Sequence, residues 1–157
     1  SGSTPERLPL GPPLPPSRRT TVSSMMHAPT IRVVAAMIED GGRYLITQRR
    51  PSAVLPLLWE FPGGKVEPGE SDSTALEREV LHRLGVSVGV GKLISFVRHP
   101  YERYTIDLHL YECHLTAGRP EKLNVQDFAW VQSDEFEHYP FTPADEISVA
   151  KLLGIGG

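Results

Sequence analysis

The sequence predicts one domain in which helices pack on a mixed β-sheet, an α/β or α+β sandwich. The 157 residues suit a single domain. Strand-like and helix-like segments follow one another in the order β-β-β-α-β-β-β-α. Such an order places helices against a mixed sheet. The residues after position 30 are enough for one hydrophobic core.

Residues 1–30 are expected to be a disordered, proline-rich tail ahead of this domain. They hold seven of the fifteen prolines, most of them in the PLGPPLPP run of residues 9–16. Proline fixes φ and lacks a backbone donor, so this run is extended. Ser1-Gly2-Ser3 is typical of an expression-vector remnant. The alternative for the run is a ligand for an SH3-type groove. The single domain is then expected over residues 31–157.

Charge and hydropathy exclude several classes of protein. The formal net charge is −3 and the isoelectric point is near 6.1. Binders of polymeric nucleic acid or of anionic membranes are basic, so neither is an expected partner. No apolar run approaches the ~18 residues of a membrane span. The single cysteine, Cys113, rules out an internal disulfide. The expected location is cytoplasmic, and a single nucleotide stays possible as a ligand.

Five strands are expected from β-branched and apolar segments bounded by turn residues. They cover residues 31–38, 43–49, 90–97, 105–115 and 128–131, with one further short strand inside the glycine- and proline-rich loop 59–70. Within 105–115 the apolar residues change face after Leu110. That change predicts either a β-bulge or a strand covered on both faces.

Two helices have clear start and stop signals. The first runs from Ser71, a good N-cap, to Leu84, and Gly85 suits the position after its end. The second begins at Thr142-Pro143, with proline in the first turn, and ends before Gly154.

The segment 64–86 carries the most specific pattern in the chain. It resembles the Nudix box, G-x5-E-x7-R-E-U-x-E-E-x-G-U, where U is aliphatic. Seven defined positions match at the right spacing: Gly64, Glu70, Arg78, Glu79, Val80, Gly85 and Val86. The flanking residues 58–65 and 142–145 are similar to the MutT-like branch of that family. The resemblance implies the Nudix fold, an α/β/α sandwich whose mixed sheet is flanked by helices.

The resemblance also implies metal-dependent chemistry. Family enzymes hydrolyse a nucleoside diphosphate linked to another group, with Mg²⁺ (or Mn²⁺) as cofactor. Three glutamates at i, i+3 and i+4 of one helix hold the ions on one face. Here those positions are Glu79, His82 and Arg83, which sum to zero charge instead of −3. The implied metal ligands are therefore Glu79, the Gly64 carbonyl and His82.

The box is degenerate on this interpretation. Arg83 places a fixed cation where Mg²⁺ should sit, and the His82 imidazole suits a softer metal better. MutT-like members have a further glutamate, in the loop before the tryptophan-containing strand, that helps to bind metal or activate water. Aligned on Trp130, this position falls near Asn124, and Glu121 and Asp127 are the alternative residues for it. Taken alone, Glu79 and Arg83 are an ordinary helix-surface ion pair.

The catalytic frame implied by the resemblance is Glu79 with Arg78 and Glu70, the last two bracing the loop against the helix by an ion pair. The implied contacts to a nucleoside triphosphate are Arg49, Lys65, Phe61, Asp145 and, in place of metal, Arg83. Ionised Asp145 only accepts hydrogen bonds, so it prefers a base with N–H donors, such as cytosine or guanine. Its plainer role is to complement a helix dipole. Arg49 also suits a strand-end surface charge, and Phe61 and Trp59 suit a hydrophobic core.

Two functions remain open from the sequence. The first is a MutT-like nucleoside triphosphate pyrophosphohydrolase that releases a nucleoside monophosphate and pyrophosphate. The second is a catalytically inactive Nudix-fold module that binds a nucleotide or a protein. Positions 82, 83 and 124 favour the second.

Overall fold

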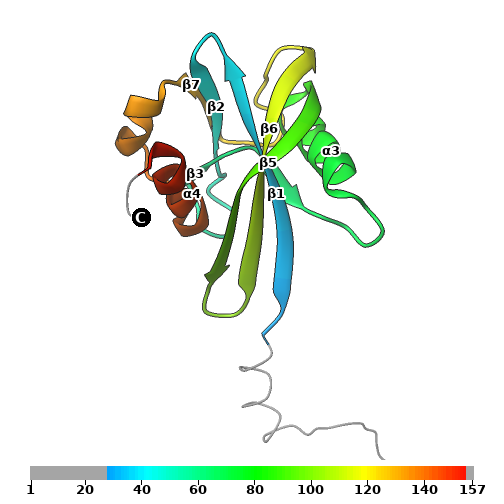
Figure 1. Ribbon diagram of the computed structural model, residues 1–157, viewed down its shortest axis with the longest axis vertical. Helices are drawn as coiled ribbons and strands as arrows, with labels where there is room; N and C mark the ends of the chain where they lie inside the picture. The colour runs from blue at the N-terminus through cyan, green and yellow to red at the C-terminus, as the bar shows by residue number, and fades with distance from the viewer. Residues whose placement is uncertain (1–27, 155–157) are drawn as a thin grey trace, which may run out of the picture.

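The computed structural model describes residues 28–154. The expected tail lies outside the described residues except for Ala28, Pro29 and Thr30, the last of which opens the first strand. In chain order (Figure 1) the elements are β1 (Thr30–Asp40), β2 (Arg43–Gln48), β3 (Trp59–Glu60), β4 (Gly63–Lys65), α3 (Asp72–Leu84), β5 (Ser87–Pro100), β6 (Thr105–Ala117), β7 (Asp127–Val131), the 3-10 helix η2 (Ser133–His138) and α4 (Pro143–Leu153).

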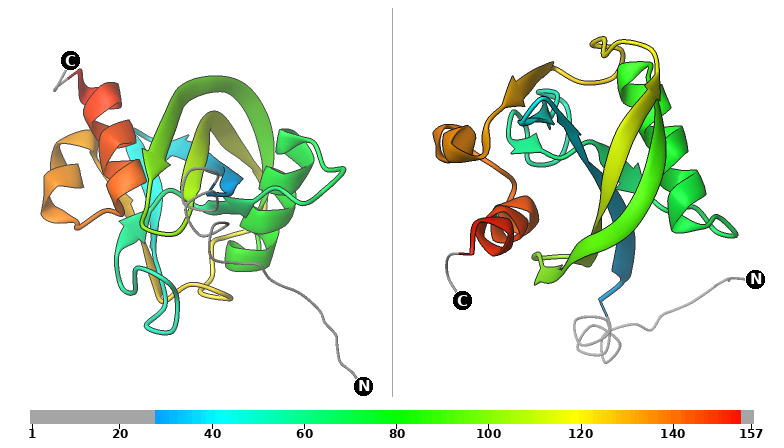
Figure 2. Two further views of the ribbon diagram at one scale, coloured as in Figure 1. Left: turned by 90° about the horizontal axis from the view of Figure 1, so that it is seen from below. Right: turned by 45° about the horizontal axis from the view of Figure 1, so that its top comes forward.

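The seven strands form one mixed sheet. Its main path is β3-β2-β1-β6-β5, with β4 paired to β1 and β7 paired to β2. β1 runs parallel to β6 and antiparallel to β2 and β4. α3 covers one face, while η2 and α4 cover the other (Figures 1 and 2). The α/β/α sandwich and its mixed sheet are therefore confirmed.

The two central strands separate two hydrophobic cores. Val34, Ala36 and Ile38 of β1 pack toward α3, whereas Ala35 packs on the opposite side. β6 behaves in the same way: its residues 108 and 110 join the core beneath α4, and residues 111, 113 and 115 join the core beneath α3. The change of apolar face in this segment thus reflects a strand covered on both faces.

Within residues 105–115 β6 carries no additional residue. The β5–β6 register shifts between Val90 and Leu93 and again between Leu93 and Ser95, each time with the additional residue on β5, and a third shift, between Ser87 and Val88, leaves Thr116 of β6 as the additional residue. β6 itself stays in continuous register with β1 from Thr105 to Cys113. The long, curved β5–β6 hairpin in front of β1 is visible in Figure 1.

Both helices begin and end as predicted. The Ser71 side chain accepts from Thr74 N at the start of α3, and Gly85 ends that helix in the left-handed region at φ 74°. Thr142 caps α4, Pro143 lies in its first turn, and Gly154 ends it. No helix over residues 28–154 is long and apolar enough to cross a bilayer.

Several bounds differ from those predicted. β5 begins three residues earlier and ends three residues later than expected, because pairing with β6 extends it through polar positions. β2 ends at Gln48, so Arg49 begins the following loop. The 3-10 helix η2 was not predicted, since its six residues are too few for a helical pattern.

The first turn of α3 is fixed to the sheet by a charged network. Both carboxylate oxygens of Asp72 accept from Arg32 of β1, at 2.7 and 2.6 Å, and the Tyr111 hydroxyl of β6 donates to the same carboxylate. The hydrogen bond from Arg32 lowers the pKa of Asp72 to about 2. These contacts orient the helix that carries the Nudix-like residues.

Candidate nucleotide site

Glu79 lies on α3 between two arginines. Arg78 Nη1 donates to its Oε2 at 2.8 Å, and Arg83 Nε donates to its Oε1 at 3.0 Å. The Glu79 side chain is only 12% exposed. The expected i, i+4 pair is therefore present, and it lies in a partly buried setting, where charge pairs are less screened than at the surface.

Gly64 of β4 lies directly against this carboxylate. A β-carbon at position 64 would be 2.3 Å from the Glu79 carboxyl carbon. β4 is placed by its antiparallel pairing with β1, which sets Gly64 opposite Val34. Any side chain at this position would displace Glu79, so the close approach requires glycine.

Arg78 joins the loop before α3 to the helix. Its guanidinium donates to both carboxylate oxygens of Glu70, at 2.6 and 2.8 Å, and to the Lys65 carbonyl at 3.1 Å. The Arg78 hydrogen bonds, followed by one from the Glu67 N–H, lower the pKa of Glu70 to about 2. The bracing ion pair predicted for Glu70 and Arg78 is confirmed.

A cavity of about 410 Å³ opens beside Gly64 and Arg83. Its size suits a small-molecule ligand. Six of the residues predicted from the sequence line it: Arg49, Phe61, Gly64, Lys65, Arg83 and Asp145. They come from α3, α4 and the strands and loops between residues 49 and 65, so the fold brings together positions nearly one hundred residues apart.

Arg49 is paired inside the cavity with Glu60, a residue that the sequence analysis did not single out. Arg49 Nη1 donates to the Glu60 carboxylate oxygens at 3.0 and 3.3 Å. Burial raises the pKa of Glu60 in spite of Arg49 and Arg83 nearby. The only sequence signal was an acidic residue within the otherwise apolar stretch 57–61.

The Asp145 carboxyl group is buried in the wall of the cavity. Its Oδ1 accepts from the Phe61 N–H at 3.1 Å, its Oδ2 accepts from the Thr142 hydroxyl at 2.5 Å, and the residue is 5% exposed. Burial and the nearby negative charge of Glu60 raise the pKa of Asp145 to about 7. At neutral pH this carboxyl group can therefore donate as well as accept a hydrogen bond.

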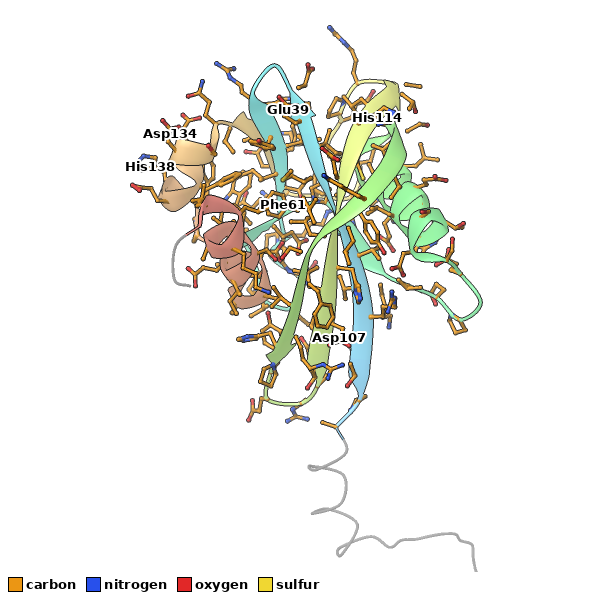
Figure 3. All side chains as sticks on the ribbon, viewed as in Figure 1. Glu39, Phe61, Asp107, His114, Asp134 and His138 are labelled. Carbon is orange, nitrogen blue, oxygen red and sulfur yellow. The ribbon has the colours of Figure 1, made fainter. Side chains whose placement is uncertain are left out.

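Phe61 is a buried core residue at the wall of the cavity. The residue is 2% exposed, and its ring contacts those of Phe136 and Phe141. It also lines the cavity. Figure 3 shows it near the centre of the molecule, beside α4. Trp59 is buried in the same core and packs edge-on against Tyr139.

The remaining metal-site candidates lie elsewhere. His82 is exposed and, among residues 28–154, does not line the cavity. Its carbonyl accepts from Asn124 Nδ2 at 2.9 Å, and Asn124 N donates to the Arg83 carbonyl at 3.0 Å. Asn124 therefore satisfies terminal carbonyls of α3. Glu121 is exposed, and Asp127 lies 3.7 Å from Lys122 Nζ. Within the described part of the chain, no group of three His, Cys, Asp or Glu residues is arranged to hold a metal ion.

Comparisons with known proteins define the family. Residues 33–151 match the family model described as the NUDIX domain. CTP pyrophosphohydrolase of Escherichia coli (strain K12) is 37% identical over 115 residues, covering 73% of this chain and 85% of that protein. The solution structure of the E. coli ORF135 protein has a TM-score of 0.70 and 34% identity, covering 82% of this chain and 92% of that one.

A third relative is the MutT protein of methicillin-resistant Staphylococcus aureus 252. Its solution structure has a TM-score of 0.66 and 32% identity, and covers 81% of this chain and 98% of that one. The chain belongs to the Nudix family, in its MutT-like branch.

Proposed function

We propose that this protein binds nucleoside triphosphates in the cavity lined by Arg49, Arg83 and Asp145, without a divalent metal, and hydrolyses them weakly or not at all. The pairing of Glu79 with two arginines carries the proposal. Each carboxylate oxygen of Glu79 already accepts from a guanidinium group. Mg²⁺ needs several oxygen ligands in octahedral geometry, and a neighbouring guanidinium opposes its charge. The residues at positions 79, 82 and 83 therefore do not fit the cofactor of the family.

Arg83 supports metal-independent binding of phosphate. Its Nε holds Glu79, while its two terminal amino groups form no hydrogen bond within residues 28–154. Arg83 lines the cavity together with Lys65 and Arg49. Guanidinium groups bind phosphate oxygens through paired, charge-assisted hydrogen bonds. In this proposal Arg83 contacts the polyphosphate directly, in the position where a family enzyme holds it through metal.

The base is recognised by Asp145 on this account. The E. coli relative is a CTP pyrophosphohydrolase, and CTP is therefore the first ligand to test. Cytosine offers an amino donor beside a ring acceptor, which matches a carboxyl group that both accepts and donates. Asp145→Ala is expected to change the ranking of affinities among nucleotides. An unchanged ranking would refute this assignment.

A working hydrolase is the second candidate, and the contact between Gly64 and Glu79 favours it. The Gly64 backbone and the Glu79 carboxylate remain in close contact at the family positions. The His82 imidazole suits Mn²⁺ better than Mg²⁺. In this case activity would depend on Mn²⁺ or on a carboxylate from elsewhere in the chain.

Phosphate release from a panel of nucleoside triphosphates separates the two candidates. The assay includes pyrophosphatase and uses Mg²⁺ or Mn²⁺ with the parent protein and the His82→Glu/Arg83→Glu variant. We expect little or no release from the parent and clearly faster release from the double variant, which regains two carboxylates on α3. Release by the parent as fast as by the double variant, with either metal, would contradict the proposal.

A further inference from the structure

The loop of residues 51–58, between β2 and β3, gathers apolar side chains at the edge of the cavity. Val54 is 63% exposed. Val54 and Leu55 both line the cavity. In the left view of Figure 2 the loop is the teal segment beside β2 and β3. Single exposed apolar residues are ordinary, but a cluster at a pocket entrance is typical of a ligand contact.

The backbone of this loop is strained at two residues. Leu55 has φ 57° and Leu57 has φ 64°, and within residues 28–154 they alone among non-glycine residues have positive φ. A leucine β-carbon clashes with the backbone in this region, so the conformation is unfavourable. Strained residues persist where the surrounding contacts fix them, and they cluster at ligand sites.

Arg49 supplies those contacts. Its Nε donates to the Val54 carbonyl at 2.6 Å, and its backbone N–H donates to the Leu58 carbonyl at 2.8 Å. The Leu57 N–H donates to the Arg49 carbonyl at 3.1 Å. The same guanidinium holds Glu60 at 3.0 Å inside the cavity. One side chain thus links the strained loop to the polar wall of the site.

We infer that the Leu55 side chain packs against the nucleoside of a nucleotide bound in the cavity and thereby positions it. The inference rests on the proposed function. A nucleobase has two apolar faces and a polar edge. Asp145 and Glu60 provide polar groups for the edge, and Leu55 provides an apolar wall for a face. Arg49 keeps Leu55 in place by fixing the Val54 carbonyl next to it.

Two ligands distinguish contact with the nucleoside from a general effect on the site. The α,β-methylene analogue of CTP carries a nucleoside and a non-hydrolysable triphosphate, whereas inorganic tripolyphosphate carries only the phosphates. Both are titrated by calorimetry in EDTA. The variants are Leu55→Ala, the conservative Leu55→Met and the matched control Leu57→Ala. Leu57 has the same backbone conformation, but within the described residues it does not line the cavity.

Leu55→Ala is expected to weaken binding of the CTP analogue about tenfold, the effect of losing a largely buried side-chain contact. Its affinity for tripolyphosphate should stay unchanged. Leu55→Met should bind both ligands as the parent does, and so should Leu57→Ala. Thermal unfolding of each variant confirms that it is folded.

Two results would overturn the inference alone: a Leu55→Ala variant that binds the CTP analogue like the parent, or one that loses affinity for both ligands equally. In either case the parent still binds the analogue, so the proposed function stands. A parent that binds neither ligand, with or without metal, would overturn both.

Discussion

The α-carbon of Gly64 and the carboxylate of Glu79 are in such close contact that no side chain fits between them. A β-carbon at position 64 would lie 2.3 Å from the Glu79 carboxyl carbon and 2.5 Å from its Oε1. This contact joins β4 to α3 at the centre of the Nudix-like segment. Glu79 is therefore confined by Gly64 on one side and held by Arg78 and Arg83.

Gly64→Ala is expected to lower the free energy of unfolding by about 1–3 kcal/mol, because the new methyl group forces Glu79 out of place. Chemical denaturation measures the loss. In a Glu79→Ala background the same substitution should cost less, since the space beside position 64 is then free. An equal cost in both backgrounds would show that the contact is not the cause.

Arg83→Gln is expected to weaken nucleotide binding in EDTA by about tenfold, the loss of one or two charge-assisted hydrogen bonds. Tripolyphosphate binding should weaken equally, because the contact is to phosphate. Stability should change little, since Arg78 still pairs with Glu79. Calorimetry measures both affinities, with the exposed Arg119→Gln as control. If Arg83→Gln binds tripolyphosphate like the parent, Arg83 is not a phosphate contact.

Asp145 makes stability depend on pH. Its pKa of about 7 in the folded protein lies above its ordinary value of 3.8. The folded state therefore favours protonated Asp145. The stability that this protonation contributes to the fold is lost as the pH rises from about 4 through 7. Asp145→Asn removes this titration. We expect the parent to lose thermal stability relative to Asp145→Asn between pH 5 and pH 8, as followed by circular dichroism. A constant difference between the two proteins would contradict the raised pKa.

Asn124→Ala is expected to lower the free energy of unfolding by about 1 kcal/mol, because the His82 carbonyl loses its side-chain donor. Lys122→Ala is the control: Lys122 lies in the same loop, and its ion pair with Asp127 is exposed and 3.7 Å long. Denaturation of both variants checks this prediction. If the two variants are equally stable, the Asn124 side chain does not stabilise the C-terminal end of α3.

Local sequence patterns predicted most of the helices and strands. Ser71, Gly85 and Pro143 marked the helix ends because capping depends on residues a few positions apart. The resemblance to the Nudix box likewise implied the ion pair between Glu70 and Arg78. The full length of β5 was not predictable in this way, because its polar ends are strands only through pairing with β6.

Six of the candidate residues line one cavity, but the sequence did not predict which contacts they make there. Arg49 and Asp145 were both candidates, but no local sequence pattern shows that Glu60 pairs with Arg49 and raises the pKa of Asp145. Asn124 was considered where the family places a glutamate, and the structure uses it at the end of α3. The strain in the loop of residues 51–58 was not predictable, since positive φ at leucine has no sequence signature.

Calorimetric titration of the parent protein with the α,β-methylene analogue of CTP, in EDTA and again with Mg²⁺, shows whether the triphosphate is held by Arg83 or by a metal ion. Metal-independent binding through Arg83 predicts that the analogue binds at least as tightly in EDTA as in Mg²⁺, which competes with the arginine for the phosphate oxygens. Binding that appears only when Mg²⁺ is present would contradict the account, because the metal and not the arginine would then hold the triphosphate.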